Sequence, residues 1–256
     1  MNIRLRSLAA LAASFLLVAS AAAQTDLEKA AAALKAGDLA AADTVLAPLV
    51  AATPPDAAAL HLLSQVRLAQ KRAKDAVEAA EAATKADATK PDYFSQLGVA
   101  LSQRMGEVGF MQMAMMSGKM KSAFEKAVAL DPKHIGGLVG LARFYSNAPE
   151  IAGGSLTKAA EYAERVKAIV PFLGESELGR IAEKGENYEQ ALQHYEASLA
   201  ARPENPGTLV AAGSVLAKLG RRDEARTRFE AALKLNPELG AAKKALAALD
   251  APTPAS

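Results

Sequence analysis

The amino-acid sequence predicts an all-α fold built from repeated helical hairpins. Hydrophobic residues make up 51% of the chain but aromatic residues only 5%, and tryptophan is absent, which favours closely packed helices over a β-sandwich. An amphipathic helix preceded by a turn and closed by a proline occurs at 184–203 and again at 219–237. Gly213 follows Gly179 after about 34 residues, and Pro237 follows Pro203 after the same interval. A fixed period of this length is typical of helical repeats.

The N-terminal segment over 1–23 carries the features of an export signal. Arg4 and Arg6 precede an apolar run over 8–19 that is short for a membrane span, and Ala21 and Ala23 are small residues suited to signal peptidase. We therefore expect a signal peptide over 1–23, cleavage after Ala23, a periplasmic mature chain and no stable membrane insertion after cleavage. An uncleaved membrane anchor is the alternative.

Charge and cysteine content exclude several classes of partner and chemistry. The chain has 30 basic and 28 acidic residues, and loss of Arg4 and Arg6 makes these numbers equal. The basic residues alternate with acidic ones along the helices, so no nucleic-acid partner is expected. There is no cysteine, which leaves neither disulfides nor a thiol nucleophile.

The last complete hairpin shows why the repeated residue types are needed. Gly213 and Ala225 are small where two helices should cross, and Phe229 should fill the space beside them. Gly220 is placed to end the first helix in a left-handed conformation. Pro237 closes the second helix because it cannot continue one.

These residues carry a resemblance to a known family. The places of the tetratricopeptide repeat (TPR) pattern are occupied by Leu209, Ala212, Gly213, Leu216, Ala225, Phe229 and Pro237, so the segment resembles a TPR. The inserted stretch APEIAGGS over 148–155 resembles that of bacterial exported TPR proteins, where no catalytic role attaches to it. The resemblance implies a right-handed superhelix of about six TPR-like helical hairpins with a C-terminal capping helix. It also implies a concave groove, lined by the first helix of each unit, that binds a peptide, chain terminus or helix of a partner protein.

Counting by this period extends the repeats over almost the whole mature chain. The predicted TPR-like domain covers 24–249, and a flexible tail covers 250–256. The predicted units lie near 24–56, 57–90, 91–134, 135–171, 172–205 and 206–239, with the cap at 240–249.

Two units depart from the pattern, with insertions over 103–120 and 147–157 whose role the sequence does not assign. The first insertion is rich in methionine. Because Phe110, Met113, Met116 and Met120 recur at helical spacing, we interpret them as an apolar packing stripe. The alternative function is Cu(I) handling through the thioethers of the Met-rich segment 105–120.

No enzymatic motif occurs in the sequence, and no catalytic residue, cofactor or metal is expected. His61, His134 and His194 fall in three different units. We interpret each as a solvated or hydrogen-bonded surface histidine, because no recognisable motif places an acidic or hydroxyl partner beside it. His194 is expected on the exposed side of a second helix.

The resemblance also selects residues for the partner-binding groove, through the repeat positions that line it in TPR proteins. These residues are His61, Gln65, Asp92, Ser95, Arg143, Asn147, Arg180, Lys184, Ser214 and Lys218. The C-terminal half of this predicted groove is the basic half, because it contains Arg143, Arg180, Lys184 and Lys218. Glu183 lies among these cations and reduces their net charge. The sequence thus predicts a non-enzymatic periplasmic scaffold whose partner is a protein or peptide, with components of cell-envelope assembly or transport among the candidates. It makes no prediction of oligomeric state.

Overall fold

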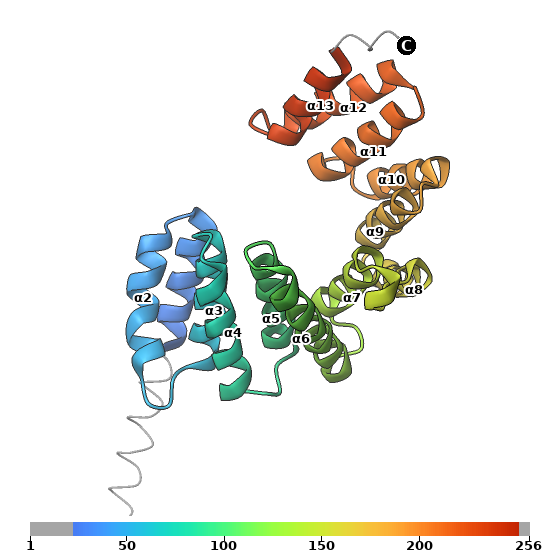
Figure 1. Cartoon of the computed structure of the whole chain (residues 1–256). Helices are drawn as coiled ribbons and strands as arrows, with labels where there is room; N and C mark the ends of the chain where they lie inside the picture. The colour runs from blue at the N-terminus through green and yellow to red at the C-terminus, as the bar shows by residue number, and fades with distance from the viewer. Residues whose placement is uncertain (1–22, 251–256) are drawn as a thin grey trace, which may run out of the picture. The chain divides into compact units, whose positions relative to one another are not determined.

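The computed structural model describes residues 23–250, and helices connected by turns and short loops account for all of them (Figure 1). The predicted all-α fold is confirmed, because no β-strand occurs within this range. The predicted signal peptide, apart from its last residue, and positions 251–256 of the predicted tail lie outside the described residues. None of the helices within 23–250 is long and apolar enough to cross a membrane.

The described residues form six helical hairpins and a final helix. A helix over 23–36 packs on α2 (Leu39–Ala51) in the first hairpin. The other hairpins are α3 (Ala57–Ala69) with α4 (Ala73–Ala86), α5 (Pro91–Met105) with α6 (Phe110–Leu130), α7 (Ile135–Asn147) with α8 (Leu156–Lys167), α9 (Pro171–Lys184) with α10 (Tyr188–Ala201), and α11 (Pro206–Lys218) with α12 (Arg222–Leu235). The final helix α13 (Gly240–Asp250) packs on α12 and α11.

The chain divides into two compact units, one ending at Pro132 and the other beginning at Lys133. In the first unit, α3 contacts α5; in the second, α7 contacts α9 and α9 contacts α11. Among the described residues, no two second helices of neighbouring hairpins are in comparable contact. The first helices therefore lie on the inner side of each stack, and we call the surface they form the inner face of that unit.

The crossing of the two helices in a hairpin explains the small residues of the repeat. A Cβ atom built on Gly213 would lie 2.6 Å from Cε1 of Phe229, and one on Gly179 would lie 2.7 Å from the Tyr195 ring. Both distances are too short for real atoms, so only glycine lets the ring pack flat against the first helix. Ala225 and Phe229 are 0% and 1% exposed, which confirms their predicted places in the core.

In four of the six hairpins of the described residues, the short turn between the two helices contains one left-handed residue. Gly220 takes φ +76° there, as predicted, and Gly37 takes φ +79° at the equivalent turn. Lys71 and Glu186 occupy the same turn in other hairpins, each with φ +60°. Because L residues adopt this conformation at a cost, these two positions are locally strained.

The two insertions take different forms. Most of the first is helical, since α6 has 21 residues and begins directly after a short turn over 106–109. The second forms a loop with a 3-10 turn at Glu150–Ala152, followed by Gly153 at φ +86°. The Ser155 side chain then accepts a hydrogen bond from Lys158 N at 3.3 Å and so caps the start of α8.

Candidate partner-binding groove

The predicted groove residues all lie on first helices, but they are divided between the two units. His61 and Gln65 lie on α3, and Asp92 and Ser95 on α5, in the first unit. The second unit holds Arg143 and Asn147 on α7, Arg180 and Lys184 on α9, and Ser214 and Lys218 on α11. Each unit therefore has its own candidate surface.

In the first unit the candidate surface is a small aromatic cluster. His61 lies against Tyr93 with ring centroids 5.0 Å apart, and Gln65 Nε2 lies 2.8 Å from His61 Nε2. Since the amide nitrogen can only donate, the ring proton is then on Nδ1, which is buried and has no hydrogen-bond partner among the described residues. Burial lowers the pKa of His61, and the Asp92 charge opposes that effect only in part.

In the second unit the inner face is organised around one buried carboxylate, Glu177. This side chain is 3% exposed. Arg143 donates from Nε and Nη2 to its Oε1 at 3.0 and 2.6 Å, and Arg180 donates from the same two atoms to its Oε2 at 3.0 and 2.6 Å. Arg180 Nη1 also donates to Ser146 Oγ at 3.1 Å. The two arginines supply the charge-assisted hydrogen bonds that a buried carboxylate needs.

A second carboxylate, Glu183, ties α9 to α10 and α11. Its Oε1 accepts from Lys218 Nζ at 3.0 Å and its Oε2 accepts from the Tyr195 hydroxyl at 3.0 Å. The Lys218 ammonium also lies 4.9 Å from the centroid of the Tyr188 ring. The hydrogen bond from Lys218 to Glu183 raises the pKa of that lysine.

Glutamates therefore neutralise part of the basic wall that the sequence predicts. Arg143 and Arg180 share Glu177, and Lys218 is paired with Glu183. Lys184 is exposed and makes no ion pair with any residue of the described range. The four cations retain an excess of two positive charges over the two glutamates.

The remaining predicted groove residues of the second unit, and Ser95 of the first, take no part in these ion pairs. Ser214 donates back to Val210 O on its own helix at 2.9 Å. Ser95 is buried at 8% exposure, whereas Asn147 is exposed.

Sequence reasoning missed Glu177, Ser146 and Tyr93, yet a signal for two of them existed. Arg143 and Glu177 are 34 residues apart, and so are Ser146 and Arg180. The repeat period applied to polar residues therefore identifies both contacts.

The predicted placement of His194 on the exposed side of α10 was wrong. Its side chain is 22% exposed, and its Nδ1 lies 2.7 Å from Glu175 Oε2. Lys167 Nζ lies 2.7 Å from the other oxygen of that carboxylate. Burial alone would raise the pKa of Glu175, but the hydrogen bonds from Lys167 and His194 outweigh it and leave the pKa lowered. Packing of α10 against α9 creates this contact, and no local sequence motif predicts it.

His134 caps the start of α7, where its Nδ1 accepts a hydrogen bond from Gly137 N at 3.0 Å.

The methionines of α6 do not all pack as the sequence predicts. Phe110, Met111 and Met115 are 85%, 79% and 65% exposed, and Met113 is 37% exposed. Met116 and Met120 are half-buried. The stripe interpretation therefore fails for Phe110 and for the first turn of α6, because that turn extends beyond the part of the helix that packs on α5.

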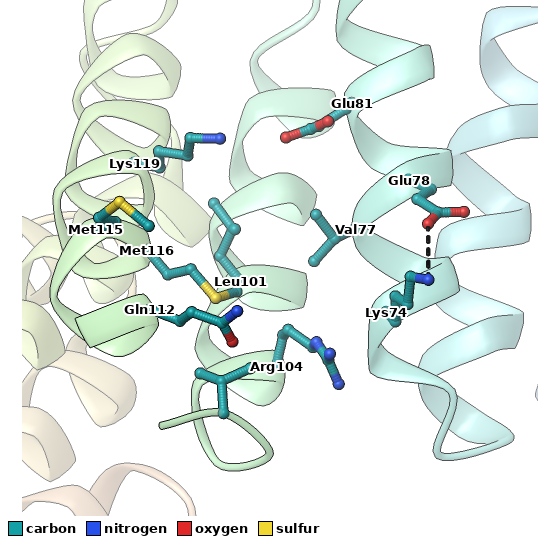
Figure 2. Close-up of a pocket in the computed structure, with 11 residues that line it drawn as sticks. Lys74, Val77, Glu78, Glu81, Leu101, Arg104, Gln112, Met115, Met116 and Lys119 are labelled. Atoms are coloured by element: carbon teal, nitrogen blue, oxygen red, sulfur yellow. Dashed lines mark ion pairs between the residues drawn. The ribbon is translucent and has the colours of Figure 1, made fainter. Parts of the chain in front are cut away.

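A cavity of about 390 Å³ lies between α4, α5 and α6 (Figure 2). Side chains at helical spacing line both walls, with Leu101 of α5 between them. The α4 wall is formed by Lys74, Val77, Glu78 and Glu81, and the α6 wall by Gln112, Met115, Met116 and Lys119. No group of three or more His, Asp or Glu side chains within the described residues is placed to hold a metal ion.

Comparison with known families is consistent with this architecture. Residues 27–91 and residues 183–249 each match a family model described as tetratricopeptide repeat. The chain is a tetratricopeptide repeat protein. The two matched segments lie in different units, so each unit contains TPR hairpins. A search of curated proteins finds no match.

Several solved structures share the TPR fold at low sequence identity. PilW, described as a widely conserved type IV pilus biogenesis factor, is 16% identical with a TM-score of 0.68, covering 88% of this chain and 98% of PilW. The pilF protein of Pseudomonas aeruginosa is 17% identical with a TM-score of 0.63, covering 90% and 98%. A thermophilic TPR protein of Thermus thermophilus is 18% identical with a TM-score of 0.64, covering 76% and 98%.

Proposed function

We propose that this TPR protein is a non-enzymatic scaffold of the periplasm that holds a peptide, chain terminus or helix of a partner protein on its inner face. TPR membership supports the scaffold role, since stacked hairpins offer extended surfaces for binding. The basic start and short apolar run of the N-terminal segment support export. PilW is a pilus biogenesis factor with the same fold, so a component of cell-envelope assembly is the first class of partner to test.

The observation that carries this proposal is the arginine pair around Glu177. Arg143 remains 56% exposed although it is bound to Glu177. Its guanidinium is thus held in one orientation on the inner face while part of it still faces solvent, so little entropy is lost when a partner binds. Lys184, one turn of α9 beyond Arg180, adds an unpaired charge. A partner segment with acidic or carbonyl oxygens complements this surface.

Site-specific photo-crosslinking in the exporting cells tests the proposal. A photoreactive residue at position 184 on the inner face should form an adduct with a partner, whereas one at Lys234 on the outer helix α12 should not. Changing Arg143 and Arg180 together to glutamine should reduce the adduct, and raising the salt concentration should do the same, because surface charges are screened.

The matched control removes two positive charges from helices that do not form the inner face. Lys234 and Lys244 are exposed on α12 and α13, and their change to glutamine should leave the adduct at position 184 unchanged. An adduct that persists in the Arg143 and Arg180 variant, or that appears equally at position 234, would reject the inner face of the second unit as the binding surface.

Cu(I) handling is the second candidate, favoured by the exposure of the thioethers of Met111, Met113 and Met115. Met111 and Met115 lie one helical turn apart on the same side of α6, but Met113 points to a different side. The helix therefore presents only the Met111 and Met115 sulfurs on one side as ligands for a single copper ion. We expect no tight stoichiometric Cu(I) binding, and replacement of Met111, Met113, Met115 and Met116 by leucine should leave metal affinity and helicity unchanged. Tight binding that disappears in this variant would favour copper.

A further inference from the structure

The first half of α6 has an apolar face whose residues are exposed, although Met115 at its edge also lines the cavity between α4, α5 and α6. Met111, Ala114, Met115 and Gly118 follow the spacing i, i+3, i+4 and i+7, and all four are exposed, so they form one side of the helix. Met111 is 79% and Met115 65% exposed. We call these four residues the methionine face.

Large and small residues alternate along this face in a self-complementary order. Reading from Met111 toward Gly118 gives large, small, large, small. Reading the same four residues from the opposite end gives small, large, small, large. Two copies of α6 that run antiparallel therefore place each methionine opposite a small residue, which lets the side chains of one helix enter the gaps of the other.

We propose that the methionine face binds a second copy of this chain through a two-fold symmetric contact. The axis passes between Ala114 and Met115. Met111 of each copy then packs on Gly118 of the other, and Met115 packs on Ala114. The contact is isologous, since the same residues serve both sides. Gly118 has no atom within 4 Å of the position where a Cβ would lie, so the space for the incoming methionine exists in the single chain.

Charges at the two ends of the face agree with antiparallel pairing. No charged residue occurs between Glu107 and Lys119, and Lys121 follows close behind. When two copies run antiparallel, Glu107 of one copy, which also binds Arg104 of its own chain, comes near Lys119 of the other at both ends of the contact. Lys119 makes no ion pair among the described residues, whereas Lys121 is paired with Glu125. Around the adjacent cavity, three cations (Lys74, Arg104 and Lys119) and three glutamates (Glu78, Glu81 and the nearby Glu107) balance. These surroundings therefore give no net charge that would attract a strongly charged partner.

The contact involves about two helical turns from each copy, so it buries less than the roughly 800 Å² per partner of a standard interface. We therefore expect a reversible dimer whose population rises with protein concentration. The methionine face lies on a second helix and not on the inner face, so this inference is independent of the proposed function.

The test is sedimentation equilibrium of the mature chain over a range of concentrations, with charges introduced near the axis. The parent should approach twice the chain mass at high concentration. Met115→Lys and Met115→Glu should each be monomeric, because each brings two like charges together. An equimolar mixture of the two variants should recover the dimer, because opposite charges then meet across the axis.

A second variant keeps the fold and blocks the contact by volume. Gly118→Met fills the space meant for Met111 of the other copy, while replacing a helical glycine with a better helix former. It should be monomeric with unchanged or increased helical circular dichroism. The control is Ile151→Lys, at a position that is 100% exposed in the other unit, which should dimerise like the parent.

A parent that stays monomeric at every concentration would overturn the proposal and leave this face to a different protein. Charge variants that still dimerise, or a mixture that fails to recover the dimer, would overturn it as well.

Discussion

Phe229 shows at the scale of one residue how the repeat is held together. Its ring lies against Gly213 and is 1% exposed, so Phe229→Ala should leave a cavity and lower the free energy of unfolding by about 3–5 kcal/mol. Phe110→Ala is the matched control, since that ring is 85% exposed and should change stability very little. Urea unfolding of both variants gives the two values. Equal losses would contradict the core assignment of Phe229.

His61 should make stability depend on pH near neutrality. Burial lowers its pKa below the ordinary value of 6.5, so below about pH 6.5 the unfolded chain binds a proton that the folded chain does not. Stability contributed by the neutral ring is therefore present above that pH and is lost as the pH falls. His61→Gln should show a smaller fall in the unfolding midpoint between pH 7.5 and pH 5.5 than the parent. An identical fall in both proteins would show that His61 does not contribute.

At the scale of an element, the hairpin turn shows how local strain is distributed among the repeats. Glu186 holds φ +60° where Gly220 holds φ +76° in the next hairpin. Glu186→Gly should raise the free energy of unfolding by about 0.5–1 kcal/mol, because relief of the left-handed strain exceeds the entropic cost of glycine.

The reciprocal change provides the control for this turn. A Cβ at Gly220 would meet no atom within 4 Å, so Gly220→Ala tests the backbone conformation alone. It should destabilise the protein by about 1 kcal/mol. Chemical denaturation measures both variants, and a stabilising Gly220→Ala would mean that the turn relaxes to another conformation.

At the scale of the whole molecule, the predicted export signal sets where the mature chain should begin. Ala21 and Ala23 flank the expected cut, so the mature chain should begin at Gln24 and carry equal numbers of acidic and basic residues. The intact mass of the protein from envelope fractions measures this. A mass that retains Met1 would contradict both export by cleavage and the neutral charge of the mature chain.

The hairpins and their core were predictable because the information is local and periodic. Gly213, Ala225 and Phe229 stand one repeat period after Gly179, Ala191 and Tyr195, and each constrains how its own two helices can cross. Gly220 and Pro237 end helices through backbone geometry that operates within a few residues. The sequence therefore predicts the hairpins without knowledge of how they stack.

The candidate site was predictable only in outline. The groove positions of the family place Arg143, Arg180 and Lys218 on first helices, which is where they lie. Their ion pairs with Glu177 and Glu183 were not predicted. Those glutamates meet the cations only after neighbouring hairpins pack, so a residue-by-residue reading of charge overestimated the basic character of the wall.

The sequence by itself determined the helical repeat, its period, the turn glycines and the small residues at helix crossings, because these follow from backbone conformation and side-chain volume within one hairpin. Only the tertiary structure decided that Glu177 is buried between two arginines, that His194 meets Glu175, and that the first turns of α6 expose their methionines. The physical reason is the same in each case. Burial and pairing depend on which surfaces of successive hairpins come into contact, and that contact joins residues that are distant in the sequence.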